Sequence, residues 1–478
     1  MLASCTSEDI LEPEPFRPDM ENRHRLVETT GVRTYTPDEF SSAFAQAVNN
    51  YIMYLYPDLP VPAEGISLAL KSFVSARSSE LYWKFVLEGH FSYSFTNQKF
   101  TFRSVRADGD SATFSGSVLY PTPGSGSHIL DGMTLLHNYA NADDNSLLTK
   151  QFDMLYLRVI YNQAIVFCDT EGFGADYGQC VPYFDGFSKG RQQVDAAIAA
   201  NEILRKRGIT FSGDAFTENI GVSLGGNSAM GAQKYLESSQ CPDWVEEEVL
   251  PGFRSFVTDC PTSVGKILDC YMDNDSLTIP CTVPMMVSTL FATQPEAADE
   301  FTFYDYFDEN INRYRITNSK GRKVGELDAF IQSLLPQDKL FVYFASYGSR
   351  MKKFMNQSLF NEYGRLDRNL RQVQLLYNCL DKIDIAKDWT PEHPMLWLSS
   401  PDDDVIPYTV SQDTYIKFKD NHGEVVLIPT AGTHVESTGI SMILSSALAR
   451  PSTTVSVSYL KDSDISDILL FLTEMLGE

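Results

Sequence analysis

The stretch that decides the fold spans residues 219–226 and runs NIGVSLGG. Its first half predicts a short apolar strand, and its second half opens a helix. Ser223 therefore stands at a strand-to-helix turn, with Gly221 and Gly225 two residues to either side. Such a turn lifts a serine hydroxyl clear of a sheet, because the glycines leave room for strand and helix to pack closely. The stretch predicts a nucleophile, with the Leu224 backbone amide placed to donate to an oxyanion.

Short apolar runs alternate with helical stretches on both sides of this turn. Predicted strands cover residues 133–136, 164–168, 219–222, 253–258, 395–398 and 425–428, and predicted helices cover 145–159, 188–206 and 225–237. Alternation of this kind is typical of a parallel sheet with helices on both faces. We therefore expect an α/β fold built on a mostly parallel, doubly wound sheet.

The part of the chain before residue 130 has a different pattern. Residues 85–120 alternate apolar and polar side chains around Asp108-Gly109-Asp110, which predicts a hairpin. Residues 36–84 show apolar residues at helical spacing after Thr36-Pro37-Asp38-Glu39, a sequence typical of a helix start. Packing of this helical extension against the main domain is all that its sequence indicates.

The chain divides into five predicted parts. These are a tether (1–35), a helical N-terminal extension (36–84), the first part of the α/β core (85–260), a helical insertion (261–391) and the second part of the core (392–478). The insertion is rich in aromatic residues and methionine. Those side chains would suit a lid over the ends of the strands, and they would equally suit a helical subdomain that packs its own core.

An acid and a base follow the serine in chain order, each just after a predicted strand. Asp402, Asp403 and Asp404 follow strand 395–398, and His434 follows strand 425–428. The carboxyl ends of parallel strands open into one crevice, so these side chains are expected to meet there. The histidine would take the serine proton, and one carboxylate would orient the histidine. The alternatives are an ordinary loop histidine and a solvated acidic loop or calcium site.

These motifs resemble the α/β-hydrolase superfamily from about Thr101 to the C-terminus. The family's acid usually stands four residues before a proline, and residues 403–407 (DDVIP) match that pattern, which favours Asp403. Residues 167–174 (FCDTEGFG) are similar to the segment after the family's fourth strand, and the secretory-lipase branch is the most similar. The resemblance implies an α/β-hydrolase fold in which residues 261–391 form a helical lid.

Two positions depart from the family pattern. The usual His-Gly after the third strand is His137-Asn138 here, followed by Tyr139. The resemblance implies that this loop supplies the second oxyanion amide, from Asn138 or Tyr139, and His137 is expected to be a buried residue that positions the loop. The usual His-Gly before the acid is Ser399-Ser400, outside the catalytic residues.

Composition excludes several functions. The 478 residues carry a formal net charge of −25 and a pI near 4.6, whereas nucleic-acid binding needs a basic face. No run approaches the roughly 20 apolar residues of a membrane-spanning helix. No Cys-x-x-Cys or His-x-x-x-His pair occurs, so neither a structural metal nor any cofactor is expected.

The first residues resemble the lipidation site of bacterial lipoproteins. Leu2-Ala3-Ser4 precedes Cys5, and an acidic, proline-rich stretch follows, as in surface lipoproteins of Bacteroidota-like bacteria. The resemblance implies an exported protein, anchored at the outer membrane or cell surface of a bacterium only through a lipid on Cys5. A chance match of four residues is the alternative. Of the eight cysteines, two sets are close enough in sequence to pair, Cys168 with Cys180 and Cys260 with Cys270.

Three functions remain open. The first is a serine hydrolase that cuts a carboxylic ester, such as a lipid ester, through an acyl-enzyme on Ser223 with His434 and Asp403. The second is a serine peptidase of the same fold, since the same three residues cleave peptides. The third is a surface binding protein on a hydrolase scaffold that has lost its activity, against which the complete, correctly ordered Ser-Asp-His set argues.

Overall fold

The computed structural model describes residues 23–36, 39, 94–122, 128–137, 157–160, 162–177, 179–273, 282–307, 355–434 and 437–438. Most of the predicted tether and of the helical extension 36–84 lies outside these residues. At the predicted helix start, the Thr36 amide donates to Glu39 Oε2 (2.8 Å) and the Glu39 amide donates to Thr36 Oγ1 (3.3 Å). This reciprocal pair is a capping box, the expected signature of a helix N-terminus.

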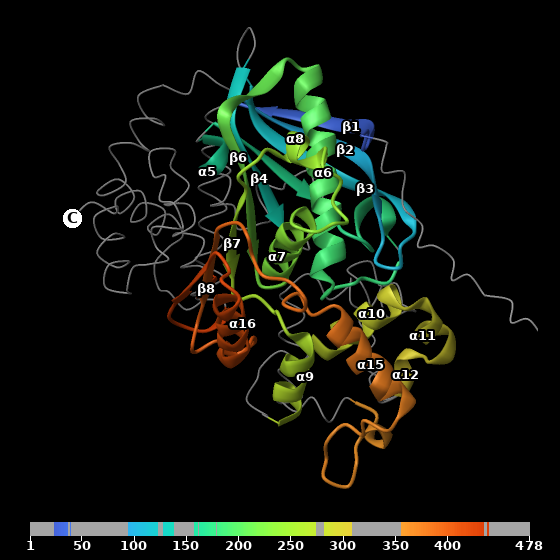
Figure 1. Cartoon of the computed structure of the whole chain (residues 1–478). Coiled ribbons are helices and arrows are strands. Elements are labelled where there is room, and N and C mark those ends of the chain that lie inside the picture. Colours follow the sequence, from blue (N-terminus) through green and yellow to red (C-terminus); the bar gives the residue numbers. More distant parts are fainter. Residues whose placement is uncertain are drawn as a thin grey trace, which may run out of the picture.

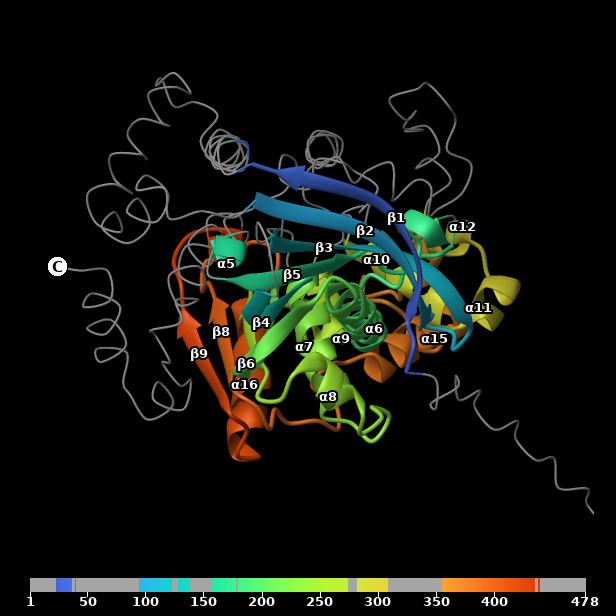
Figure 2. The ribbon, with the colours of Figure 1, turned by 90° about the horizontal axis from the view of Figure 1, so that it is seen from above.

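The described strands form a single nine-stranded sheet, in the order β1-β2-β3-β5-β4-β6-β7-β8-β9. The strands are β1 (Leu26–Tyr35), β2 (Ser94–Val105), β3 (Ser111–Thr122), β4 (His128–His137), β5 (Gln163–Cys168), β6 (Ile209–Val222), β7 (Arg254–Thr258), β8 (Met395–Ser399) and β9 (Val425–Pro429). The pairs β1–β2, β2–β3 and β3–β5 are antiparallel, and all other neighbours are parallel. Figure 2 shows the sheet twisting steadily from β1 to β9. The predicted, mostly parallel sheet is confirmed.

The antiparallel end of the sheet holds one confirmed prediction and one correction. Strands β2 and β3 form the hairpin expected around Gly109, whose φ of 98° suits the tight turn. Residues 26–35, expected to belong to the tether, instead form β1 on the edge of β2. The acidic, proline-rich composition ends before Leu26, and the β-branched residues that follow favour an extended strand that bonds to β2.

Helices cover both faces of the sheet. On one face lie α6 (Gly186–Lys206), α7 (Leu224–Leu236), α8 (Val245–Val249) and α16 (Tyr408–Asp420), and α5 (Leu157–Ile160) lies on the other (Figure 2). Apolar side chains of α6 pack with those of β2, β4 and β5 into one core, and α7 and α16 meet β7 and β8 in another. The strands therefore carry α7, which begins immediately after Ser223, in a fixed orientation.

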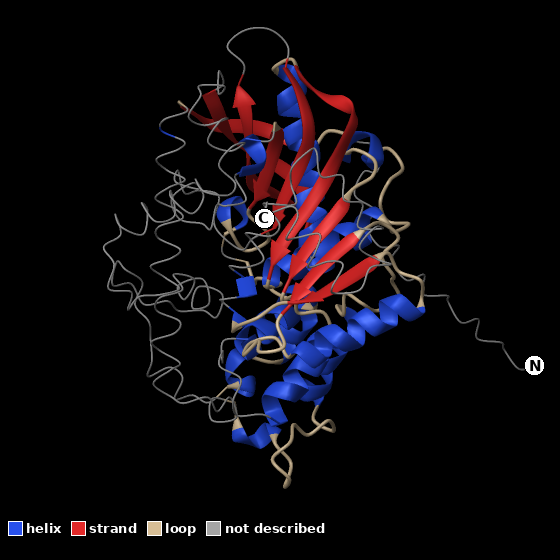
Figure 3. Cartoon of the chain, turned by 90° about the vertical axis from the view of Figure 1, so that its left-hand side faces the viewer, coloured by secondary structure: helices blue, strands red, loops and turns tan. Residues whose placement is uncertain are grey.

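A group of helices from the predicted insertion gathers at one end of the sheet (Figures 1 and 3). They are α9 (Val264–Asp273), α10 (Thr282–Thr293), α11 (Pro295–Glu300), α12 (Phe303–Tyr306) and α15 (Arg371–Lys382). Their apolar side chains form a shared core that also includes Phe173, Tyr183 and Val405 from loops after the strands, with Leu224 packed against it. The described part of residues 261–391 is thus largely helical and packs into this shared core, and movement of the insertion as a lid stays a prediction.

The cysteines do not pair as their spacing suggested. Cys168, Cys260 and Cys270 are thiols outside any disulfide, so neither of the two suggested pairs forms. Cys168 belongs to β5 and donates to Gln193 Oε1 (2.9 Å), and Cys260 lies against Met230 of α7. Tertiary packing separates residues that are close in sequence. Among the described helices, none has the length and apolar character needed to cross a bilayer.

Candidate active site

Ser223 occupies a strained turn between β6 and α7. Its φ of 55° and ψ of −122° lie in a region that non-glycine residues rarely adopt. The Ser223 amide donates to the Thr258 carbonyl of β7 (2.8 Å), which ties the turn to the neighbouring strand. A Cβ on Gly221 would overlap the Gly225 carbonyl, so glycine is required at that position. The sequence-predicted turn and both of its glycines are therefore present, with Ser223 partly exposed.

The predicted acid and base meet at the ends of β8 and β9. The His434 Nδ1 and Asp403 Oδ2 atoms are 2.8 Å apart, and both side chains are buried. The other carboxylate oxygen of Asp403 accepts hydrogen bonds from the Val405 and Ile406 amides, at 2.7 and 2.8 Å. These two amides hold the carboxylate so that its free oxygen faces the imidazole.

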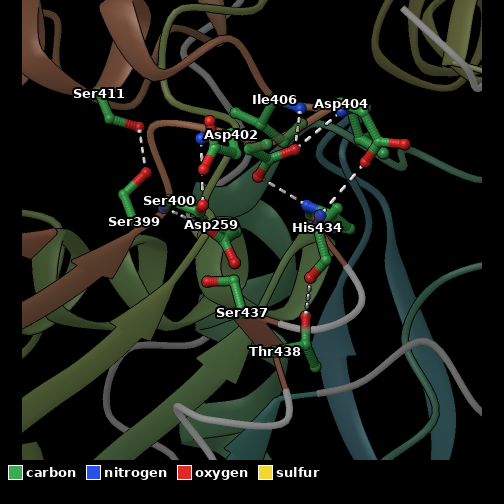
Figure 4. A network of polar contacts seen from close by, with 12 residues as sticks. Asp259, Ser399, Ser400, Asp402, Asp404, Ile406, Ser411, His434, Ser437 and Thr438 are labelled. Atoms are coloured by element: carbon green, nitrogen blue, oxygen red, sulfur yellow. Dashed lines mark hydrogen bonds and ion pairs between the residues drawn. The ribbon is translucent and has the colours of Figure 1, made fainter. Parts of the chain in front are cut away.

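The neighbouring aspartates do not compete with Asp403 for this position. Asp402 is exposed, and its backbone amide donates to the Ser400 hydroxyl (3.1 Å). Asp404 is partly exposed and accepts from the backbone amide of His434, not from its ring (3.2 Å). The structure therefore brings Asp403 alone of the three to the imidazole Nδ1, as the family pattern implied. Figure 4 shows Asp402 near Ser400 and Asp404 near His434.

The surrounding carboxylates make His434 a stronger base. Burial by itself would lower the pKa of His434. The hydrogen bond and charge of Asp403, together with the charges of Asp259 and Asp404, outweigh burial and raise this pKa above its usual value. A histidine in this state accepts a proton readily near neutral pH.

A further acidic residue at the site, Asp259, was not predicted. Asp259 follows β7 directly, is fully buried, and has a φ of 42°. Its Oδ1 accepts from the Ser400 amide (2.9 Å), and Figure 4 shows it between Ser400 and Ser437, beside His434. Burial raises the pKa of Asp259 to about 7, and the charge of Asp403 contributes. The rule that selected residues 402–404, an acid just past a predicted parallel strand, would have found it.

The Ser223 turn and Asp259 follow neighbouring strands. The Ser223 amide is bonded to Thr258, the residue before Asp259. One oxygen of Asp259, one of Asp403 and one nitrogen of His434 lie within 4.8 Å of one another. Ser223, Asp259, Asp403 and His434 therefore each follow the carboxyl end of one of four adjacent strands, β6 to β9. This is the edge of the sheet where α/β proteins build their sites.

The same three side chains are the one group of potential metal-binding residues among those described. Their atoms are already committed to one another, because His434 Nδ1 bonds to Asp403 and Asp259 Oδ1 bonds to Ser400. Two carboxylates beside one imidazole are suited to proton transfer. The arrangement gives no support to the calcium alternative for residues 402–404.

A small cavity lies beside the start of α7. Apolar side chains of Phe173, Val181 and Leu224 line it, together with the polar groups of Thr170, Tyr183, Lys189 and Ser228. The ammonium of Lys189 is buried and donates to the Tyr183 carbonyl. Burial lowers the pKa of Lys189 to about 8. The cavity reaches the residue whose amide would face an oxyanion.

The second oxyanion loop is described only up to its first residue. His137 ends β4 and is buried, and burial lowers its pKa to about 3. It is therefore uncharged at neutral pH, in agreement with a positioning role. Asn138 and Tyr139, the predicted oxyanion residues, lie outside the described residues, as does Cys5.

Comparisons with known proteins address the fold. No protein-family model matches the chain, and no curated protein sequence matches it. Among solved structures, it is similar to the rice cell wall degrading esterase LipA from Xanthomonas oryzae, with 15% identity, a TM-score of 0.58 and coverage of 92% of this chain and 100% of that one. It is also similar to Candida antarctica lipase A in its closed state, with 14% identity, a TM-score of 0.51 and coverage of 77% and 80%. The strand order and these likenesses agree, and the chain has the α/β-hydrolase fold.

Proposed function

We propose that this protein is a serine hydrolase that cleaves carboxylic esters through an acyl-enzyme on Ser223. The proposal is carried by the strained Ser223 turn at the end of β6 and by the 2.8 Å contact between His434 Nδ1 and Asp403 at the ends of β8 and β9. A side chain held at a positive φ has a cost of roughly 1–3 kcal/mol, which a fold retains where function requires that geometry.

The reaction follows from the roles of these groups. The Ser223 hydroxyl attacks the ester carbonyl carbon while His434 Nε2 takes its proton, and Asp403 keeps the other ring nitrogen protonated. The Leu224 amide, at the first residue of α7, has no carbonyl partner within its own helix and donates to the oxyanion. We assign the second donor to the loop of Asn138 and Tyr139.

The products then leave in two stages, each through a tetrahedral intermediate of its own. His434 first gives its proton to the leaving alkoxide, which departs as an alcohol and leaves the acyl group on Ser223. A water molecule next attacks the acyl carbon while His434 takes its proton, and the carboxylic acid is released as Ser223 regains its hydrogen. No redox step or external reactant other than water is needed.

An ester is favoured over a peptide as the substrate. The similar structures are named as an esterase and a lipase. The core of the helical insertion is apolar and touches Leu224, so a substrate with an apolar acyl part would meet a compatible surface. A peptidase of the same fold is the competing proposal, and a substrate panel separates the two.

The first experiment is labelling with a fluorophosphonate probe, in the wild type and in Ser223→Ala, beside a panel of p-nitrophenyl esters from acetate to palmitate and of aminoacyl- and Gly-Pro-p-nitroanilides. We expect labelling in the wild type, none in Ser223→Ala, and turnover of esters. Turnover of the anilides alone would favour the peptidase. A well-folded wild type that is neither labelled nor active, even with detergent present, would support the binding protein.

We also propose that the protein is exported and carries a lipid on Cys5. The support is the Leu2-Ala3-Ser4-Cys5 sequence and the acidic stretch that follows it. Expression of residues 2–478 behind the basic and apolar regions of a bacterial lipoprotein signal peptide, with an alkynyl palmitate in the medium, should label the wild type and not Cys5→Ser. Equal labelling of both would contradict the proposal.

A further inference from the structure

Asp259 is a buried carboxylate that the reaction above does not use. Its side chain has no exposure to solvent, its Oδ1 accepts a hydrogen bond from the Ser400 amide, and the Ser437 side chain is close enough to lower its pKa. Within the described residues, Oδ2 makes no hydrogen bond of normal geometry, although Ser437 lies beside it (Figure 4). A buried carboxylate with an unbonded oxygen is costly unless a positive charge compensates it.

The group that can supply this charge is His434. Oxygens of Asp259 and Asp403 and a nitrogen of His434 all lie within 4.8 Å of one another. The other charged group facing His434 is Asp404, which is partly exposed and bonds to the histidine backbone. His434 is neutral while it waits for substrate and becomes an imidazolium when it takes the Ser223 proton. The cation therefore exists only in the states that the reaction must stabilise.

We propose that Asp259 is a second positioning carboxylate of the active site, which in its ionised form stabilises the His434 imidazolium while Asp403 holds its Nδ1–H. This role rests on the proposed serine chemistry. It acts through charge, because Asp403 already occupies the ring N–H and the Ser400 amide already occupies Asp259 Oδ1. Asp259 has a φ of 42°, in the left-handed region, and its carboxylate is fully buried.

The proposal has a consequence for the pH dependence. Burial raises the pKa of Asp259 to about 7, and the neighbouring acids raise the pKa of His434 above its usual value. The two groups titrate as a coupled pair. As the pH falls, the loss of activity should therefore follow the uptake of two protons, one by His434 and one by Asp259. If the acid beside the histidine stayed charged at all pH values, the loss would follow the uptake of a single proton.

The test is the pH profile of kcat/KM and of fluorophosphonate labelling for the wild type, Asp259→Asn and Asp402→Asn. Asparagine keeps the oxygen that accepts from Ser400 and removes only the charge. We expect the acid limb of Asp259→Asn to become a one-proton limb, with a midpoint about one pH unit lower. Its plateau should drop by up to about tenfold. Asp402→Asn, in the same loop and exposed, should keep the wild-type profile.

Each outcome decides the proposal. A folded Asp259→Asn whose rate drops at all pH values without a shift of the limb would show that Asp259 only supports the Ser400 loop. If Asp259→Asn does not fold, the wild-type labelling profile decides, since a one-proton limb there overturns the proposal and a two-proton limb supports it. If the wild type is not labelled at all, the proposed serine hydrolase function itself is wrong. That outcome is distinct from an unshifted acid limb in Asp259→Asn, which contradicts only the role of Asp259.

Discussion

Replacing Asp403 with asparagine should disable the site through the histidine tautomer. The Val405 and Ile406 amides both donate to Asp403 Oδ1, so an asparagine would keep its carbonyl oxygen there. Its NH₂ group would then occupy the place of Oδ2, 2.8 Å from His434 Nδ1. Two donors cannot bond to each other, so His434 would move its proton to Nε2 and lose the lone pair that receives the Ser223 proton.

The expected loss in kcat is about 10⁴, which is the size of effect known for a tautomer reversal in a serine hydrolase triad. At 1.36 kcal/mol per factor of ten, this equals about 5 kcal/mol of transition-state stabilisation. The free energy of unfolding should change far less, by about 1–2 kcal/mol, because the hydrogen bonds from both backbone amides to the side chain persist. Activity and stability are thus predicted to separate.

The assay is hydrolysis of the best p-nitrophenyl ester, with a urea unfolding curve for each variant. Asp402→Asn is the matched control, since it removes the same charge from the exposed neighbour. A folded Asp403→Asn that keeps more than a tenth of the wild-type kcat would refute the reasoning. A loss of about 10⁴ in Asp404→Asn instead would move the orienting role to that residue.

Three other predictions test the scaffold. Gly221→Ala should abolish fluorophosphonate labelling and destabilise the fold by at least about 1–3 kcal/mol, because the new methyl group overlaps the Gly225 carbonyl. Gly213→Ala is the control: its methyl group, in the same strand, meets open space, and labelling should be intact. Glu218→Gln should lower the free energy of unfolding in urea by about 3–5 kcal/mol, because the guanidiniums of Arg158 (Nε to Glu218 Oε2, 2.8 Å) and Arg254 would then lie beside an uncharged buried group. A loss below about 1 kcal/mol would contradict this. The hydrogen bond to Glu237 raises the pKa of His393, so this pair stabilises the fold fully below about pH 6.5. The stabilisation is lost as the pH rises through the raised pKa. The Tm of the wild type should therefore fall over this pH range, whereas the Tm of His393→Gln should not.

The nucleophile turn and most strands could be predicted from the sequence because their causes are local. Gly221 and Gly225 are needed because strand and helix pack closely within the five residues around Ser223. Buried strands are likewise recognised from their own apolar runs. The order Ser223, Asp403, His434 then placed three side chains at strand ends. Their meeting needed only the general rule that parallel strands end at one edge of the sheet.

Other features depend on partners far away in the chain. Strand β6 was predicted as residues 219–222 and extends from Ile209, because it pairs with β4 along residues whose own pattern is not regular. Strand β1 exists because the edge of β2, some 70 residues later, offers backbone hydrogen bonds. Edge pairing leaves few apolar side chains to be buried, so it leaves a weak trace in sequence.

The choice among Asp402, Asp403 and Asp404, and the presence of Asp259, show the same division within the site. Sequence spacing placed three adjacent acids near the histidine, and a family pattern favoured one. The direction of each side chain comes from the loop, where the Val405 and Ile406 amides turn Asp403 inward and Asp402 faces solvent. Asp259 joins them because β7 and β8 are neighbours in the sheet, although 136 residues lie between Thr258, the last residue of β7, and Met395, the first residue of β8. Local sterics determine which backbone shapes a sequence can form, whereas charge interactions depend on distances that only the folded sheet sets.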